Sequence, residues 1–186
     1  MGNPSTSTKK ALSIITRYAL LLLVTFPNFY IFYFIFTPLT IFPVYFLLNL
    51  LFDVSLINNI LIVNHFSIEL IDACIAGAAY YLLFALNLSI PNINLKKRVL
   101  MVFSSFVALL ILNVLRIVFL SMLFLSGSDF FDITHKISWY ALSTIFVVGI
   151  WLMEIKTFKL KEIPFYSDAR YLFKKSSLNK RIKSKI

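Results

Sequence analysis

The sequence predicts an all-α polytopic membrane protein with about four transmembrane helices, a re-entrant or interfacial element and a small extracytoplasmic hairpin-like segment. Hydrophobic residues make up 60% of the 186-residue chain, and the mean hydropathy of +0.87 is too apolar for a soluble fold. Ala11–Phe36 and Val99–Leu125 each exceed the roughly 18–20 residues that cross ~30 Å of hydrocarbon. Basic and acidic residues are segregated along the chain, as in membrane proteins with a fixed orientation.

The N-terminal third predicts one crossing and one shorter element. Residues 1–10 are polar and are expected to form a disordered cytoplasmic N-terminus. Ala11–Phe36, kinked at Pro27, is too long for the apolar region of a signal peptide and is interpreted as a retained anchor. Leu39–Phe52 is shorter and carries Pro43. A full crossing there would invert the charge pattern downstream, so a re-entrant or interfacial element on the outer side is expected.

A polar segment and three further crossings complete the expected membrane domain, residues 11–154. Between Asp53 and Ala73 the Asn64-His65-Phe66-Ser67 interruption separates two short apolar runs and predicts a strand-turn-strand at the outer interface. A helix then runs inward from Cys74 to about Ile90, and Val99–Leu125 crosses outward. Ile137–Met153 forms the last crossing, with His135 at or just before its start.

Charge placement orients these elements and argues against nucleic acid as a partner. The net charge is +10, but the basic residues gather near the first helix, in one short loop and in residues 155–186, a basic cytoplasmic tail. Most acids lie in two other segments. By the positive-inside rule the basic regions are cytoplasmic and the acidic segments face outward. The basic residues before the tail are Lys9, Lys10, Arg17, Lys96, Lys97 and Arg98, and the outward acids are Asp53, Glu69, Asp72, Asp129 and Asp132.

Arg116 is the first residue that needs an explanation, because an arginine inside an apolar run costs about 2.5–3.5 kcal/mol at mid-membrane. It follows Arg98 by 18 residues, or ~27 Å of helix, and so lies near the outer edge of the hydrocarbon. Asn113 shares its helix face, which indicates a polar pocket within the bundle. Snorkelling of Arg116 to the outer headgroups is the alternative.

Cys74 and His135 are expected at the same depth as Arg116. Cys74 is the only cysteine and starts a helix, where the macrodipole favours a thiolate. The small residues Ala76-Gly77-Ala78-Ala79 would let a neighbouring helix approach closely. The alternatives are that Cys74 is a small buried hydrophobe and that His135 is a tolerated interfacial polar residue.

Together the three residues suit acyl transfer. Cys74 would be the nucleophile, His135 the general acid and base, and Arg116 the group that stabilises the oxyanion or thiolate, with Asn113 in support. His65 is a second candidate for the base, and Asp72 or Asp132 is expected to orient an imidazole. No cofactor is expected, and one Cys with two separated His residues lacks the spacing of a metal site.

The motifs around these residues resemble those of the archaeosortase/exosortase family of membrane-embedded cysteine transpeptidases. The matching segments, in the family's order and over about Asp53–Trp151, are Ala73-Cys74-Ile75-Ala76-Gly77, Asn113-Val114-Leu115-Arg116 and Phe131-Asp132-Ile133-Thr134-His135. Many bacterial members carry Cys-Ser-Gly and are longer, so the chain looks more like a compact archaeal, pacearchaeosortase-like branch.

The resemblance implies a protein-sorting activity in the cell membrane, with the active site at the extracytoplasmic face. Family substrates are exported proteins with a C-terminal signal made of a short motif, a transmembrane helix and a basic cluster. The enzyme cuts near the motif and transfers the new C-terminus to an acceptor, often a membrane lipid. Two alternatives stay open: a hydrolase that uses the same residues without transfer, and a non-enzymatic polytopic assembly factor or transporter subunit.

Overall fold

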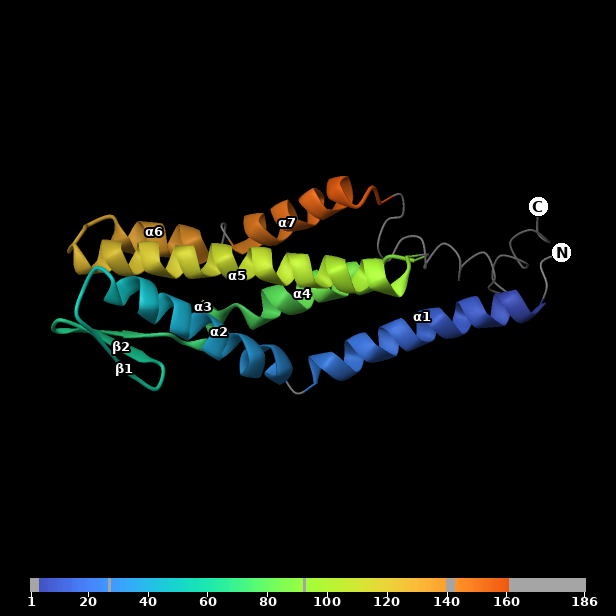
Figure 1. Cartoon of the computed structure of the whole chain (residues 1–186), viewed down its shortest axis with the longest axis horizontal. Helices are drawn as coiled ribbons and strands as arrows, with labels where there is room; N and C mark the ends of the chain where they lie inside the picture. Colours follow the sequence, from blue (N-terminus) through green and yellow to red (C-terminus); the bar gives the residue numbers. More distant parts are fainter. Residues whose placement is uncertain (1–3, 27, 92, 140–142, 161–186) are drawn as a thin grey trace, which may run out of the picture.

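The computed structural model describes residues 4–26, 28–91, 93–139 and 143–160, which are mostly helical and carry one small sheet (Figure 1). The long helix α5 runs through the middle of the molecule, with α2 and α4 on one side and α6 and α7 on the other (Figure 1). The elements are α1 (Pro4–Thr25), α2 (Tyr30–Asn49), β1 (Val54–Ile57), β2 (Ile60–Val63), β3 (Phe66–Glu69), α3 (Asp72–Ile75), α4 (Gly77–Leu88), α5 (Leu95–Leu125), α6 (Phe131–Ile137) and α7 (Ser143–Thr157).

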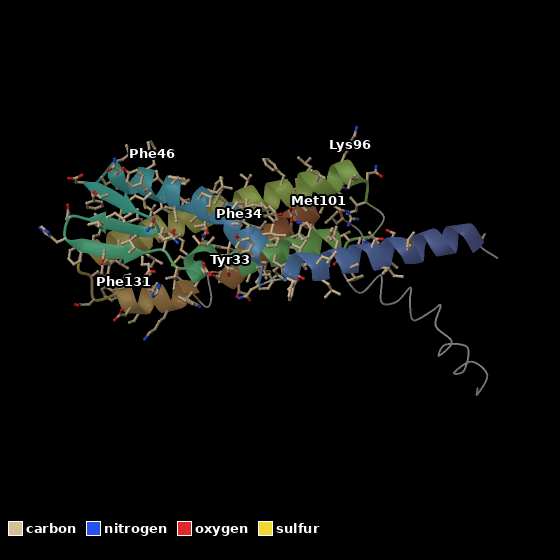
Figure 2. The ribbon with its side chains drawn as sticks, turned by 90° about the horizontal axis from the view of Figure 1, so that it is seen from below. Tyr33, Phe34, Phe46, Lys96, Met101 and Phe131 are labelled. Atoms are coloured by element: carbon tan, nitrogen blue, oxygen red, sulfur yellow. The ribbon has the colours of Figure 1, made fainter. Side chains whose placement is uncertain are left out.

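Two of the described helices, α2 and α5, are long and apolar enough to cross a membrane. Two other apolar stretches, Leu12–Thr25 and Asp72–Leu88, are shorter, and α7 has 15 residues. The expected four crossings therefore stay a prediction. Lys96, Lys97 and Arg98, expected in a short loop, lie instead in the first turn of α5. Figure 2 shows Lys96 and Phe131 toward opposite ends of the bundle, so this basic turn is far from α6.

The N-terminal elements differ from the prediction. The helix expected over Ala11–Phe36 is wrong, because Asn28 and Phe29 adopt left-handed φ angles of 51° and 59° and separate α1 from α2. The predicted kink at Pro27 falls outside the described residues. Residues 4–10, part of the N-terminus predicted to be disordered, belong to α1, which begins at Pro4. Proline suits the first position of a helix because its missing N–H has no intrahelical partner there.

The separate re-entrant element expected over Leu39–Phe52 is wrong as well, because α2 continues from Tyr30 to Asn49 through two prolines. A proline inside a helix removes a backbone hydrogen bond and costs about 3 kcal/mol. Packing outweighs that cost here, since one face of α2 is buried against α4 and α5. The buried residues of that face are Phe32, Phe36, Thr40, Ile41, Val44 and Leu48.

The predicted strand-turn-strand is confirmed and contains a third strand. β1, β2 and β3 form an antiparallel sheet in that order, joined by two-residue turns at Asn58-Asn59 and Asn64-His65. Asn58 and Asn64 both have φ of 54°, a left-handed value that asparagine tolerates better than most residues. One face of the sheet packs on the helices through Val54, Leu61 and Val63, which are at most 5% exposed.

The helix expected from Cys74 to Ile90 is interrupted after one turn. α3 ends where Ala76 takes a left-handed φ of 62°, and α4 begins at Gly77. A Cβ added to Gly77 would lie 2.7 Å from the ring of Tyr33 on α2, so the glycine is needed for this contact. The prediction that small residues here let a neighbouring helix approach is confirmed, and the same approach stacks Phe36 on Tyr80 with ring centroids 3.5 Å apart.

The last predicted crossing is divided as well. His135 lies within the short helix α6 rather than at the start of a long one, and α7 begins separately at Ser143. Residues 161–186, most of the basic tail predicted from residue 155, lie outside the described part of the chain, as do residues 1–3 of the N-terminus.

Candidate functional site

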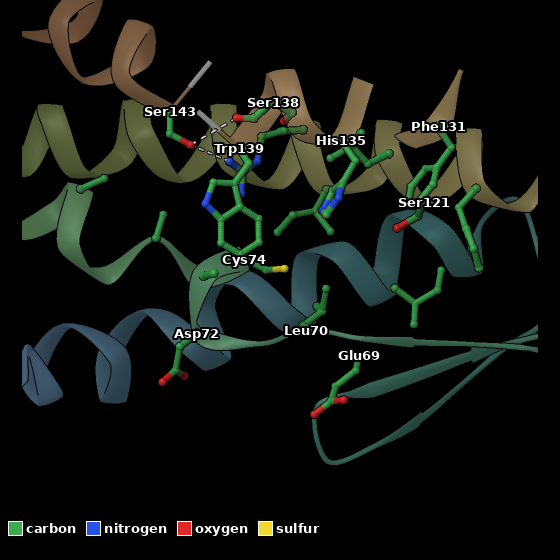
Figure 3. Close-up of a pocket in the computed structure, with 18 of the residues that line it drawn as sticks. Glu69, Leu70, Asp72, Cys74, Ser121, Phe131, His135, Ser138, Trp139 and Ser143 are labelled. Carbon is green, nitrogen blue, oxygen red and sulfur yellow. Dashed lines mark hydrogen bonds between the residues drawn. The ribbon is translucent and has the colours of Figure 1, made fainter. Parts of the chain in front are cut away.

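A pocket of about 410 Å³ lies between the end of the sheet, α3, α5 and α6. Cys74, Arg116 and His135 all line it, although they come from three separate segments of the chain (Figure 3). Most of the remaining wall is apolar, with a few polar side chains, among them Ser121, Ser138 and Ser143. The structure thus places the three residues singled out from the sequence at one site.

Cys74 sits on the one-turn helix α3, between the sheet and α4, and its side chain is half-buried. Its backbone is held at both ends: the N–H donates to the carbonyl of Ile71 at 2.8 Å, and the carbonyl accepts from Asn113 Nδ2 at 2.8 Å. Asn113 is 2% exposed, so this bond is shielded from water. Asn113 therefore supports the site by fixing the backbone that carries the thiol.

The expectation that a helix macrodipole acts on Cys74 is wrong. α3 has only four residues, and the left-handed Ala76 separates it from the dipole of α4. A macrodipole needs several aligned peptide units, which one turn does not supply. Arg116 is the one lysine or arginine among the described residues that line the pocket, so it is the fixed cation available near the thiol.

Arg116 is half-buried and faces the pocket from α5. Its Nη1 donates to Ser143 Oγ at 2.8 Å, and that hydroxyl in turn donates to the carbonyl of Ser138 at 3.4 Å (Figure 3). Its Nε is buried and has no hydrogen-bond partner among the described residues. A guanidinium has five N–H donors, so this contact leaves donors for a bound group. The side chain is directed into the bundle, as the polar-pocket interpretation expected.

His135 reaches the pocket from α6 and is held by aromatic rings. Its imidazole stacks on Phe131, with ring centroids 5.5 Å apart and planes 9° apart, and meets Trp139 edge-on at 6.0 Å. Figure 3 shows His135 and Trp139 on the α6 side of the pocket, projecting toward the side that carries Cys74. Within the described chain no carboxylate hydrogen-bonds to His135, so these rings set the orientation of the imidazole.

The other residues considered from the sequence divide between the pocket and the surface. Asp72 lines the pocket, whereas Asp132 and the second candidate base, His65, are exposed and outside its lining. The sequence reasoning missed Ser143 and Trp139. A buried arginine needs a hydrogen-bond partner, but Ser143 is 27 residues from Arg116 and no local pattern connects them.

Comparison with protein-family models, curated protein sequences and solved structures finds no match. The protein is therefore characterised by its own fold and pocket. It is mostly helical, two described helices are of membrane-spanning length, and one pocket brings together a cysteine, an arginine and a histidine. Membership of the archaeosortase/exosortase family stays a prediction from the motifs.

Proposed function

We propose that the protein is a membrane-embedded cysteine transpeptidase of the archaeosortase/exosortase type. Its substrates would be exported proteins with a C-terminal sorting signal: a short motif, a transmembrane helix and a basic cluster. The observation that carries the proposal is the meeting of Cys74, Arg116 and His135 in one pocket, because these three groups supply the parts that peptide cleavage needs.

The proposed reaction begins at the thiol of Cys74. His135 takes the thiol proton as the sulfur attacks the carbonyl carbon of the substrate, and Arg116 stabilises the resulting oxyanion. The C–N bond then breaks, the leaving amine receives the proton from His135, and a thioester remains on Cys74. A hydroxyl or amine of the acceptor, a membrane lipid or another nucleophile, attacks that thioester. Its proton passes through His135 to the departing sulfur, which restores the thiol.

The proposed location is the extracytoplasmic face of the cell membrane, in a polytopic bundle. The pocket lies beside α6 and the sheet, toward the end of α5 opposite its basic first turn, Lys96–Arg98 (Figure 1, Figure 2). Basic loops stay on the cytoplasmic side, so this separation supports an outward pocket. A substrate helix lying beside the bundle would bring its outer end, and the motif before it, to the depth of Cys74.

The test is the substitution Cys74→Ala in cells that make a surface protein with such a signal. We expect processing to stop, measured as retention of the C-terminal helix in the substrate's mass, while the variant accumulates in the membrane at the normal level. The two hydrogen bonds that hold the Cys74 backbone do not use its side chain, so the substitution preserves them. Normal processing by the variant would instead favour a non-enzymatic assembly factor or transporter subunit.

The substrate's new C-terminus distinguishes transfer from simple hydrolysis. A free carboxylate indicates a protease that passes the thioester to water, and an added lipid or other group indicates a transpeptidase. Both outcomes keep Cys74 as the nucleophile.

A further inference from the structure

The strand β3 is an edge strand, and its open edge borders the pocket. β2 pairs with β3 on one side, and in the described part of the chain no strand pairs with it on the other. Four consecutive residues, Ser67 to Leu70, line the pocket. Successive side chains of a strand point to opposite faces, so a cavity that meets four in a row meets the edge of the strand rather than one face.

The hydrogen-bond pattern shows which backbone groups lie on that edge. In an antiparallel pair every second residue exchanges its hydrogen bonds with the partner strand. The two-residue turn at Asn64-His65 makes Val63 and Phe66 a bonded pair, and the bond from the Leu70 N–H to the Asn59 carbonyl, at 2.9 Å, continues the same alternation.

The backbone groups of Ser67 and Glu69 therefore point away from β2. Neither residue makes a backbone hydrogen bond to any other described residue outside the sheet. Each outward residue presents one N–H and one C=O, and together they form a template for a short extended peptide. The two outward residues are one strand repeat apart, which matches the spacing of alternate residues in a paired strand.

The open edge leads directly to the nucleophile. Glu69 ends β3, and the chain passes through two residues into α3, which carries Cys74. Figure 3 shows Leu70 between Glu69 and Cys74, on the side of the pocket opposite His135 and Trp139. A peptide paired with Ser67 and Glu69 would therefore extend along the same side toward the thiol.

We propose that β3 captures the substrate's recognition segment as an added fourth strand, so that the segment is bound in an extended conformation with its scissile bond at Cys74. This inference rests on the proposed function and names how its substrate is held. Strand addition supplies affinity through main-chain hydrogen bonds, and pockets for alternate side chains supply specificity. Selection of an extended backbone also explains how the enzyme would reject the helical part of the signal.

The charged residues around the open edge of β3 restrict which peptides can pair with it. Glu69 and Asp72 flank the open edge, and both are exposed. Among the described residues that line the pocket, Arg116 is the one lysine or arginine, and the proposed reaction uses it for the oxyanion rather than for a side chain of the peptide. An acidic side chain next to this edge would meet like charge, so the paired segment is uncharged or basic.

The test uses the full-length protein in lipid nanodiscs and a pool of acetylated pentapeptide vinyl sulfones varied among Ala, Val, Thr and Lys. Cys74 is the only cysteine, so its modification is read directly from the intact mass. We expect the pool to modify Cys74 at least about tenfold faster than methyl vinyl sulfone, which carries the same reactive group without a peptide, because two or more hydrogen bonds are gained.

N-methylation of the peptides identifies strand pairing. Only alternate N–H groups of a paired strand face its partner. N-methylation at one alternate set of positions should lower the rate to that of methyl vinyl sulfone, and N-methylation at the other set should leave it within about twofold. Equal effects of the two sets would overturn the proposal, as would a pool that reacts no faster than methyl vinyl sulfone.

A matched pair of variants tests the same edge on the protein. Ser67→Pro removes an outward N–H that β2 does not use, and Ser67→Ala keeps it. We expect the rate of peptide labelling to fall about tenfold in the proline variant and to stay unchanged in the alanine variant. The rate of labelling by methyl vinyl sulfone should be unchanged in both variants, which is the control for folding. These results are independent of the Cys74→Ala processing test: processing that depends on Cys74, with labelling indifferent to N-methylation, would reject strand pairing and keep the proposed function.

Discussion

The polar side chains near the two ends of α5 differ in how fully they are hydrogen-bonded to other side chains. Toward its C-terminus, Arg116 has one described side-chain partner, and Cys74 and His135 line the same pocket. Toward its N-terminus, a polar cluster is linked by hydrogen bonds among its own members, which are Asn87, Ser104, Ser105 and Glu154. Asn87 Nδ2 donates to Glu154 Oε2 at 3.0 Å and to Ser105 Oγ at 3.3 Å, and Ser104 Oγ donates to Glu154 Oε1 at 3.3 Å.

The difference separates a cluster that holds helices together from a pocket that can do chemistry. The first connects α4, α5 and α7, and Asn87 and Glu154 are 0% and 5% exposed. An ionisable residue in an apolar bundle is a functional candidate by default, but Glu154 already has two donors. The residues near Cys74 keep donors and a nucleophile for a bound molecule. The comparison predicts that changes in the pocket alter activity and changes in the cluster alter stability.

The largest expected effect is on activity, from His135→Ala. Loss of a general acid and base lowers a rate by roughly 10²–10⁴-fold, so processing of the substrate should fall by that factor. The free energy of unfolding should fall by no more than about 1 kcal/mol, because the imidazole contributes ring contacts to Phe131 and Trp139. The rate is read from the mass of the substrate's C-terminus over time.

The matched control is His65→Ala, which removes the only other histidine, an exposed residue outside the pocket lining. It should leave processing within about twofold of the unchanged protein, since general acid-base catalysis requires contact with the reacting group. Loss of processing in the His65 variant alone would show that His65, in the turn of the sheet, is the general base. His135 and the pocket at the C-terminal end of α5 would then not supply it.

The next effect is on stability, from Glu154→Ala. Asn87 Nδ2 would lose one of its two acceptors, whereas the Ser104 hydroxyl also reaches the carbonyl of Met101 at 2.9 Å. An unsatisfied buried donor costs about 1–3 kcal/mol. We expect the free energy of unfolding, measured by denaturant titration of the detergent-solubilised protein, to fall by about 2–3 kcal/mol. Below the unfolding transition, processing should be retained. Glu154→Gln, which keeps one acceptor oxygen, should lose less than half as much; an Ala variant as stable as the unchanged protein would show that the cluster does not hold the helices.

The depth of the site was predictable from the sequence, whereas its connections were not. Counting from Arg98 to Arg116 along a straight helix places the arginine near the outer surface, and one face shared with Asn113 indicates a pocket. That reasoning depends only on helix geometry, which α5 follows over 31 residues. The partner Ser143 lies on another helix, and no regular spacing relates two residues that meet through tertiary packing.

The ends of the helices α1 and α3 could not be predicted from the sequence for a different reason. Phe29 and Ala76 adopt left-handed conformations that ordinary residues avoid, so nothing in their identity predicts the ends of α1 and α3. Conversely, Pro38 lies within α2, where propensity alone predicts a helix end. Burial of one face of α2 outweighs the cost of Pro38, and burial is a property of the folded chain. The strands were easier to predict, because their Asn turns and short apolar runs are local signals.

The smallest expected effect comes from Ser143→Ala, which tests how the pocket positions its cation. The serine hydroxyl accepts from Arg116 Nη1 at 2.8 Å and donates to the carbonyl of Ser138, so its loss frees the guanidinium to move. We expect processing to slow by roughly threefold to tenfold, equivalent to about 1 kcal/mol, because a misplaced donor stabilises the oxyanion less well. The melting temperature should change by no more than about 2 °C, since one hydrogen bond to a half-buried group contributes little to folding. Ser143→Thr keeps the hydroxyl and should restore most of the rate; a Thr variant as slow as the Ala variant would show that space in the pocket, rather than the bond to Arg116, limits the reaction.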